Sequence, residues 1–237
     1  MSSITIASIG RQTGLIKELE VVANNLANAS TTGYKADRAI FAELLVPTGD
    51  ADESLSLGTL AGHAYEFEQG GLKTTQGRLD LAIQGEGFFQ VETPRGNRLT
   101  RAGHFSLSDQ GTIIDPNGNP VLGQGGGPIN IPQDASDVSI AQDGTISVDG
   151  VITDSIGVFR ADGELLRDTS TYFTPQDDVA PVEFPTVIQG ALEASNVHPV
   201  TEVARMIEVQ RAYEAGQALL EQEDQRLSQL VSTIRDR

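Results

Sequence analysis

The sequence of 237 residues contains no cysteine and no tryptophan, and aromatic residues make up only 5% of it. Without cysteine, the chain can form no disulfide and can offer no thiolate as a nucleophile or metal ligand. The scarcity of aromatic side chains argues against the aromatic-lined pocket that many enzymes use to bind small molecules. The 25 glycines are instead typical of a chain with many tight turns.

Basic residues are also scarce. Lys and Arg number 16 against 33 Asp and Glu, which gives a formal net charge of −17 and a pI near 4.4. This charge does not favour binding to nucleic acid or to an anionic membrane surface. Residues 39–199 hold 23 of the acids but only 7 of the bases, so the two ends of the chain are close to neutral. Near-neutral ends suit packing against copies of themselves, whereas the acidic middle favours exposure to water.

Long hydrophobic runs are missing as well. No stretch of eighteen apolar residues occurs, so the sequence predicts no membrane-spanning helix and no direct insertion into a membrane. The first residues, Met1-Ser2-Ser3-Ile4, lack the basic segment that opens a secretory signal peptide, and the pattern that follows is amphipathic. We therefore expect no cleaved signal peptide.

The clearest pattern that is present lies in the last stretch of the chain, residues 199–237. Apolar side chains recur there every seven residues, at Met206, Tyr213, Leu220, Leu227 and Ile234. Because 3.5 residues per turn is close to the natural 3.6 of an α-helix, this repeat keeps one stripe facing a partner helix. The sequence therefore predicts a long C-terminal helix that needs a partner.

The first residues carry a similar pattern. Ile9, Ile16 and Ala23 also recur at sevens, with Leu19 and Leu26 between them, which predicts a helix over residues 4–27. The simplest arrangement is antiparallel pairing with the C-terminal helix. We therefore predict an α+β fold in which long N- and C-terminal helices pair as a coiled-coil-like stalk, with an inserted all-β globular domain and an extended connector arm.

Between the helices, short alternating runs and turns predict β structure of about eight to ten strands. Asp-Gly pairs at 143–144, 149–150 and 162–163 are hairpin signals, because both central residues of a tight hairpin turn adopt positive φ. The predicted organisation is an N-terminal assembly helix, an extended connector, an all-β domain, a return connector and a C-terminal assembly helix, over residues 1–33, 34–70, 71–185, 186–198 and 199–237.

The sequence shows no catalytic, metal or cofactor site. His63, His104 and His198 share no metal-ligand spacing, and the run that begins at Asp115 resembles a calcium loop but has Gly126 where the loop requires Glu. We therefore expect a protein that is not an enzyme and has no cofactor. A secreted acidic β-domain that acts as a binding module or an enzyme remains the alternative, and a cytoplasmic coiled-coil scaffold is a third class.

Three runs of unusual composition stand in order along the chain. They are Ala23-Asn24-Asn25-Leu26-Ala27-Asn28-Ala29-Ser30-Thr31-Thr32-Gly33-Tyr34-Lys35, then Leu81-Ala82-Ile83-Gln84-Gly85-Glu86-Gly87-Phe88-Phe89-Gln90-Val91 followed by Arg101-Ala102-Gly103-His104-Phe105, and finally Gln189-Gly190-Ala191-Leu192-Glu193-Ala194-Ser195-Asn196-Val197 with Met206-Ile207 and Gln210-Arg211-Ala212-Tyr213-Glu214-Ala215. Together these runs resemble the signatures of the bacterial flagellar basal-body rod protein family, and they span most of the chain.

The resemblance implies a structural subunit that polymerises through its terminal helices into part of the drive shaft for motility. It implies as partners copies of the chain, other proximal and distal rod proteins, the flagellar export apparatus and the surrounding basal-body rings. The implied location is the rod of the basal body, which crosses the periplasm. The length fits both larger rod types of the family. The stretches 125–132 and 140–147 are most similar to the proximal-rod type, and the distal-rod type is the alternative.

The resemblance, together with the apolar repeat of the C-terminal helix, indicates which residues form contacts between subunits. The predicted interface residues are Asn24, Asn25, Leu26, Asn28, Gly33, Tyr34, Lys35, Ser195, Asn196, Val197, Met206, Gln210, Arg211, Tyr213, Glu214, Leu220 and Leu227. The chain departs from the family pattern at Gly216, where the family usually has Asn after Tyr-Glu-Ala. This departure puts a side-chain contact at that position in doubt.

Overall fold

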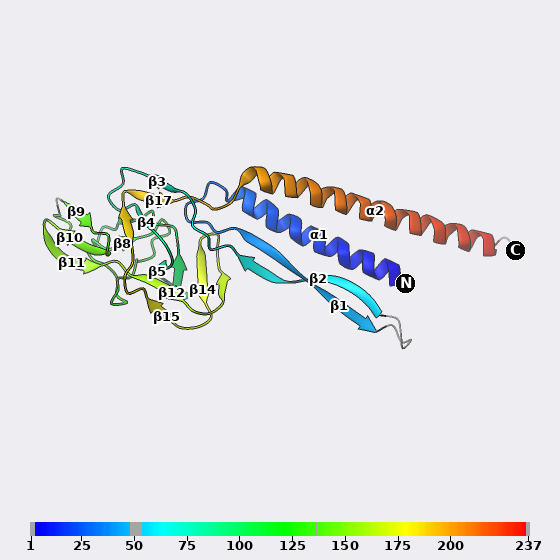
Figure 1. Cartoon of the computed structure of the whole chain (residues 1–237), viewed down its shortest axis with the longest axis horizontal. Coiled ribbons are helices and arrows are strands. Elements are labelled where there is room, and N and C mark those ends of the chain that lie inside the picture. Colours follow the sequence, from blue (N-terminus) through cyan, green and yellow to red (C-terminus); the bar gives the residue numbers. More distant parts are fainter. Residues whose placement is uncertain (1–2, 48–53, 136, 236–237) are drawn as a thin grey trace. The chain divides into compact units, whose positions relative to one another are not determined.

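The computed structural model describes residues 3–47, 54–135 and 137–235, and the chain divides into two compact units. The helical unit comprises Met1–Ala27, Ala36–Glu66 and Val197–Arg237, and the β-domain comprises Asn28–Lys35 and Phe67–Asn196. Each unit is therefore built from segments that lie far apart in the sequence (Figure 1).

Two helices and one hairpin form the helical unit. Helix α1 spans Ser3–Ala27 and helix α2 spans Pro199–Arg235. Pro199 suits the first turn of α2, because backbone N–H groups there make no hydrogen bond within the helix and proline has none to offer. Strands β1 (Asp37–Pro47) and β2 (Ser54–Tyr65) pair antiparallel, with a bulge between Ile40 and Phe41. The segment that we expected to be an extended connector thus contains a long β-hairpin.

The prediction that the terminal helices pair as a coiled-coil-like stalk is wrong. The predicted stripe of α1 is exposed to solvent, at 48% for Ile9 and 42% for Ile16, and Ala23 is exposed too. From residue 8 onward, where the structure describes burial, the buried side chains of α1 are instead Gln12, Val21, Val22 and Asn25. Residues at these positions lie on more than one side of the helix, because α1 contacts the β1–β2 hairpin as well as α2.

The contacts between the two helices also differ from those of a coiled coil. Gln12 donates from Nε2 to the backbone oxygen of Tyr213 at 3.1 Å, and Arg205 donates from Nε to Glu18 at 2.7 Å. Val209 alone is buried among the described side chains of α2. Polar side chains thus contribute much of the contact that a coiled coil makes with apolar ones.

The β-domain is built from short strands. A six-stranded sheet has the order β13-β14-β6-β5-β12-β15, a three-stranded sheet the order β11-β10-β9, and the remaining pairs are β16-β4, β17-β3 and β7-β8. Their bounds are β3 Leu72–Thr74, β4 Leu81–Ile83, β5 Phe88–Thr93, β6 Gly96–Thr100, β7 Ser106–Leu107, β8 Ile113–Ile114, β9 Val138–Ile140, β10 Thr145–Val148, β11 Val151–Ser155, β12 Val158–Ala161, β13 Leu165–Arg167, β14 Tyr172–Pro175, β15 Val179–Pro181, β16 Val187–Gln189 and β17 Ala191–Glu193.

Of the three hairpins that the Asp-Gly pairs predicted, two are present and one is not. Gly144 links β9 to β10, and Asp149 and Gly150, both with positive φ, link β10 to β11. The third signal, at 162–163, does not form a hairpin, because β12 pairs with β5 and β15 and not with β13.

Aliphatic side chains from both ends and the middle of the β-domain form its core. Leu81, Ile113, Ile146 and Ile156 are almost completely buried in it, and Phe89 meets Phe105 edge to face with ring centroids 5.2 Å apart. Alternation of inward and outward residues along short strands produces such a core. This core accounts for a compact β-domain despite the low aromatic content.

The run that resembled a calcium loop is a turn closed by hydrogen bonds. Asp115, 3% exposed, accepts from the backbone of Asn117 at 2.8 Å and of Asn119 at 2.9 Å. It also accepts from the hydroxyl of Tyr172. Its oxygens are therefore occupied by protein donors.

Burial, reinforced by the hydrogen bond to Asp115, raises the pKa of Tyr172 above its usual value near 10.0. The unfolded chain therefore loses this proton first, so the free energy of unfolding falls as pH rises above about 10, by up to about 1.4 kcal/mol per pH unit. We expect a shallower fall in Tyr172→Phe, measured by urea unfolding at alkaline pH. All other titrating groups are common to both proteins, so equal slopes would contradict the prediction.

Candidate functional site

The three sequence runs meet in the β-domain, at a buried cluster of charges. Lys35 from the first run donates to Glu193 Oε1 at 2.6 Å, and Arg101 donates from Nη1 to Glu193 Oε2 at 3.1 Å. The three residues are 0%, 4% and 1% exposed for Lys35, Arg101 and Glu193. One carboxylate from the end of the chain thus binds two cations that come from its beginning and middle.

Backbone groups complete the cluster. Lys35 Nζ donates to the backbone oxygen of Glu68 at 2.7 Å, and Gly70 donates its N–H to Glu193 Oε1 at 3.0 Å. Arg101 Nη2 donates to the backbone oxygen of Gly85 at 2.6 Å. Burial lowers the pKa of the Lys35 amine, and the hydrogen bond with Glu193 acts in the opposite direction. Arg101 Nε is buried without a hydrogen-bond partner among the described residues, so the cluster depends on the bonds that it does make. A buried ion pair is strongly destabilised by loss of either partner.

The residues next to Lys35 are held by equally close contacts. Gly33 has a φ of 69° and donates its N–H to the backbone oxygen of Glu193 at 2.8 Å. Tyr34 is fully buried, with the guanidinium of Arg167 4.4 Å from its ring centroid. Asn196 donates from Nδ2 to the backbone oxygen of Glu68 at 3.2 Å. Gly33, Tyr34, Lys35 and Asn196 therefore hold the two ends of the β-domain together, while contacts with other subunits stay a prediction.

In the helical unit, Asn25 holds the start of the hairpin against α1. Its Nδ2 donates to the backbone oxygen of Asp37 at 2.8 Å, and its Oδ1 accepts from the backbone N–H of Asp37 at 2.9 Å. Asn25 is 2% exposed, and the same Nδ2 lies 3.4 Å from Glu202 Oε2 in the first turn of α2. The carboxylate of Asp37 in turn binds His63 Nδ1 at 3.0 Å. The Asn25 amide therefore joins α1 to β1 and α2, and Asp37 extends the connection to β2.

We expect Asn25→Ala to lower the free energy of unfolding of the helical unit by about 2–4 kcal/mol. The substitution leaves a buried N–H and a buried C=O of Asp37 without partners, each at a cost of about 1–3 kcal/mol. Thermal unfolding followed by the helical circular dichroism signal measures the change. Gln210→Ala, at an exposed position of α2, is the matched control, and an equal loss in both would contradict the assignment.

The other predicted interface residues lie in varied environments. Among them Val197 is buried, Gln210, Arg211 and Glu214 are exposed, and Leu26, Asn28, Ser195, Met206, Tyr213 and Leu220 are partly buried. Asn24 is exposed, and the side chain of Leu227 lies outside the described residues. Asn28 accepts from Thr31 at the end of the first run. Arg101 and Glu193 were missed, because the sequence gives no sign that these charges are buried.

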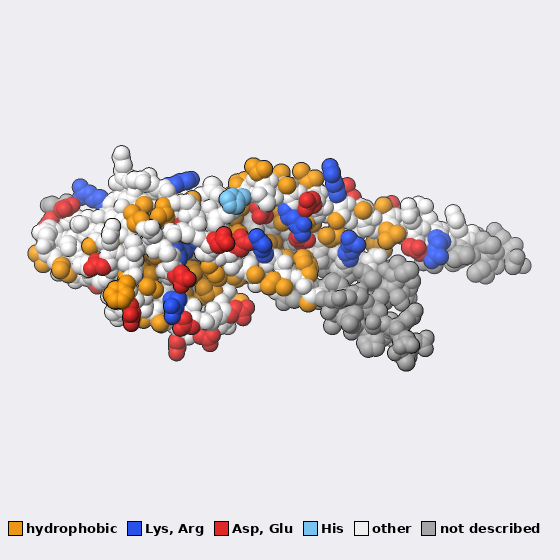
Figure 2. Space-filling view, in the orientation of Figure 1, with side chains coloured by type: hydrophobic (Ala, Val, Ile, Leu, Met, Phe, Trp, Pro, Cys, Tyr) orange, Lys and Arg blue, Asp and Glu red, His pale blue; other side chains and the backbone are white. Residues whose placement is uncertain are grey.

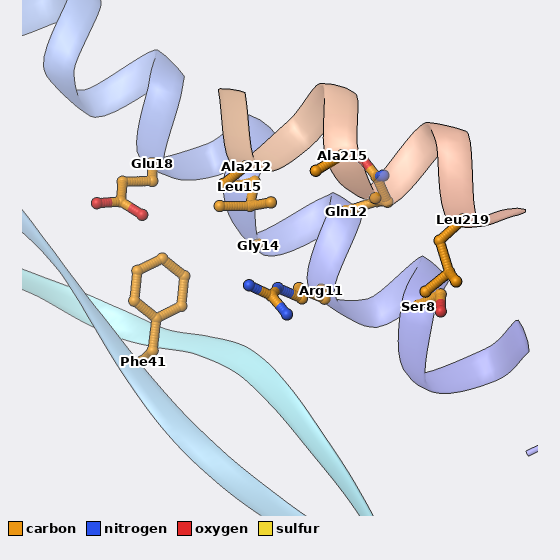
Figure 3. A pocket seen from close by; sticks show the side chains of 11 residues that line it. Ser8, Arg11, Gln12, Gly14, Leu15, Glu18, Phe41, Ala212, Ala215 and Leu219 are labelled. Carbon is orange, nitrogen blue, oxygen red and sulfur yellow. The ribbon is translucent and has the colours of Figure 1, made fainter. Parts of the chain in front are cut away.

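A groove lies in the helical unit, where α1, α2 and β1 approach one another. It has a volume of about 590 Å³, and its apolar wall includes Leu15, Phe41, Ala215 and Leu219 (Figure 3). We call this cavity the interhelical groove. Arg11 and Glu18 also line it.

The Gln12 side chain lies against the glycine at position 216. A β-carbon on Gly216 would overlap the Gln12 amide, which fills this space and binds the backbone of α2. Gln12 Oε1 is buried and has no hydrogen-bond partner among the described residues. The Gln12 side chain therefore occupies the space that a side chain at 216 would need.

No group of three or more His, Cys, Asp or Glu side chains that could hold a metal ion occurs within residues 3–47, 54–135 and 137–235. A helix long and apolar enough to cross a membrane is likewise absent from the part of the chain that the structure describes.

Three family models match the chain, in the order of its three runs. They are "Flagella basal body rod protein" over residues 9–35, "Flagellar hook protein FlgE/F/G D1 domain" over 82–148 and "Flagellar basal body rod FlgEFG protein C-terminal" over 188–233. The flagellar basal-body rod protein FlgF of Caulobacter vibrioides is 38% identical over 226 residues, which cover 91% of each chain. The chain belongs to the flagellar basal-body rod protein family.

Other members of the rod family match over similar lengths. FlgF of Mesorhizobium japonicum is 31% identical over 239 residues, covering 99% of this chain and 98% of the relative. FlgG of Bacillus subtilis is 31% identical over 247 residues, covering 92% and 94%. As a rod protein the chain is a structural component of the flagellar basal body that assembles with other rod components, and it is not an enzyme.

Proposed function

We propose that this protein is a subunit of the proximal part of the rod and that it polymerises through its helical unit. The two terminal helices carry the proposal. They expose large apolar side chains, among them Ile9, Ile16 and Ile207, and residues 1–38 and 200–237 are nearly neutral in charge. Such surfaces favour burial against other subunits.

The middle of the chain differs from its ends in charge. Residues 39–199, which include most of the β-domain, hold 23 acids against 7 bases, and between Arg101 and Arg160 the sequence contains no Lys or Arg. A surface of one charge sign repels its own copies and remains in water. We assign the contacts between subunits to the helical unit and the solvated surface to the β-domain.

The chain is 38% identical to FlgF of Caulobacter vibrioides and 35% identical to FlgG of the same organism. This difference supports the proximal type, and the distal type remains the second candidate. We further propose that the flagellar export apparatus delivers the chain to a periplasm-spanning rod and that the basal-body rings surround it there. These partners are inferred from membership of the rod family.

The test uses a strain from which the gene is deleted. We expect cells without flagella, restored by the full-length chain, which is then recovered in purified basal bodies. A strain lacking the distal rod protein separates the two types, because a proximal subunit remains in the shortened rod and a distal subunit does not. The proposal is wrong if the deletion strain still forms flagella or if the chain is absent from basal bodies.

A further inference from the structure

The first turns of α2 present an apolar surface to solvent. Val200, Val203 and Ile207 are 84%, 42% and 45% exposed. Their spacing of three and four residues places them on one face of the helix, and we call this face the α2 ridge. Hydrophobic side chains gather along the start of α2 in the space-filling view (Figure 2). The ridge is a convex apolar surface that the described chain leaves open to solvent.

The interhelical groove is a concave apolar surface of the same unit. Phe41 and Leu219 in its wall are 42% and 47% exposed, and the volume of about 590 Å³ is enough for several aliphatic side chains. The groove also has a polar wall, where Gln12 Oε1 lacks a hydrogen-bond partner among the described residues. The two surfaces thus have complementary shape and chemistry.

The charges around these surfaces match as well. Glu18 in the groove is already bound by Arg205 of the same chain, whereas the other charge in its lining is the base Arg11. The ridge face continues along α2 to Glu214, whose opposite charge can pair with Arg11 when the surfaces meet. A second copy therefore brings an apolar ridge with an acidic side chain beside it, which matches both the apolar wall and the base of the groove.

The ridge and the groove cannot bind each other within one chain. Val203 of the ridge and Ala215 of the groove stand twelve residues apart on one rigid helix, which separates them by about 18 Å along its axis. A contact between them must therefore join two copies. After it forms, one copy still has a free ridge and the other a free groove, which allows open-ended growth.

We propose that the α2 ridge of one copy binds in the interhelical groove of the next. This contact rests on the proposed function, and it specifies which two surfaces of the helical unit form the repeating joint. Val200, Val203 and Ile207 enter the groove against Leu15, Phe41 and Leu219, and Glu214 pairs with Arg11.

Because the chain contains no cysteine, introduced cysteines are the only thiols of this protein that can form a cross-link. In the full-length chain we would introduce Val203→Cys together with Ala215→Cys, express it in the deletion strain and oxidise purified basal bodies. A disulfide needs Cα atoms within about 7 Å, so the two cysteines of one chain cannot join. We expect a ladder of cross-linked copies on a non-reducing gel. The control combines Val203→Cys with Ser228→Cys, which lies on α2 outside the groove, and gives no ladder.

Charge reversal provides the second measurement. In the same double-cysteine chain, Arg11→Glu or Glu214→Arg alone should lower the yield of cross-linked copies about tenfold, and the two together should restore it. Basal bodies that contain the chain but give no ladder, or give equal ladders with the control pair, overturn this contact and leave the proposed function standing. Absence of the unmodified chain from basal bodies overturns the proposed function itself.

Discussion

Glu193→Gln is expected to lower the free energy of unfolding of the β-domain by about 3–5 kcal/mol, since it leaves two buried cations without their carboxylate. Lys35 and Arg101 both bind Glu193 directly, and all three side chains are almost completely buried. Glutamine keeps the shape of the side chain but removes its charge. Urea unfolding of the full-length chain, followed through tyrosine fluorescence, measures the loss.

The matched control is Glu92→Gln, at an exposed position of β5, for which we expect a change within about 0.5 kcal/mol. A double-mutant cycle with Lys35→Met tests the pair itself. If Lys35 acts through Glu193, the losses of the two single variants do not add in the double variant. Additive losses, or a small loss in Glu193→Gln, would contradict the assigned role of the cluster.

Gly33→Ala is expected to destabilise the β-domain by about 3 kcal/mol or more. A residue with a side chain at the positive φ of Gly33 costs about 1–2 kcal/mol. The added methyl group would also overlap the backbone nitrogen of Ala102, and backbone atoms on both sides are held by hydrogen bonds. Thermal unfolding of the purified chain measures the effect.

Gly71→Ala separates this effect from a general cost of replacing glycine. Gly71 lies in the same domain, its φ is not positive, and a β-carbon there would meet no atom within 4 Å. We expect this variant to unfold within a few degrees of the parent chain. A similar loss at both positions would show that close packing around Gly33 is not the cause.

Local turn chemistry was predictable from the sequence where the turn itself determines the strand pairing. Asp149 and Gly150 both adopt positive φ in a tight hairpin, as an Asp-Gly pair favours. At Asp162 and Gly163 the same pair does not form a hairpin, because the neighbouring strands find partners elsewhere in the sheet. Long-range pairing overrode the local signal there.

The helices show a different limit. Their existence followed from the apolar repeat, but the repeat did not reveal which side of α1 is buried. Because a hairpin packs on α1 in addition to α2, the buried set includes Gln12 and Asn25, which a search for apolar stripes passes over.

The charged cluster was the hardest feature to predict. Lys35, Arg101 and Glu193 stand in recognisable runs, yet charged residues are rarely buried unless they are paired. Their pairing depends on contacts across 158 positions of the sequence, between Lys35 and Glu193. Composition and periodicity contain no information on such distances.

The order in which the cluster becomes complete has a consequence for folding during synthesis or transport. A chain that emerges N-terminus first presents Lys35 long before Glu193. Until Glu193 arrives, the amine of Lys35 has no carboxylate partner in the site, and burying it alone carries a high desolvation cost. The ion pair can therefore form only after residue 193 has emerged, and we expect the β-domain to close no earlier.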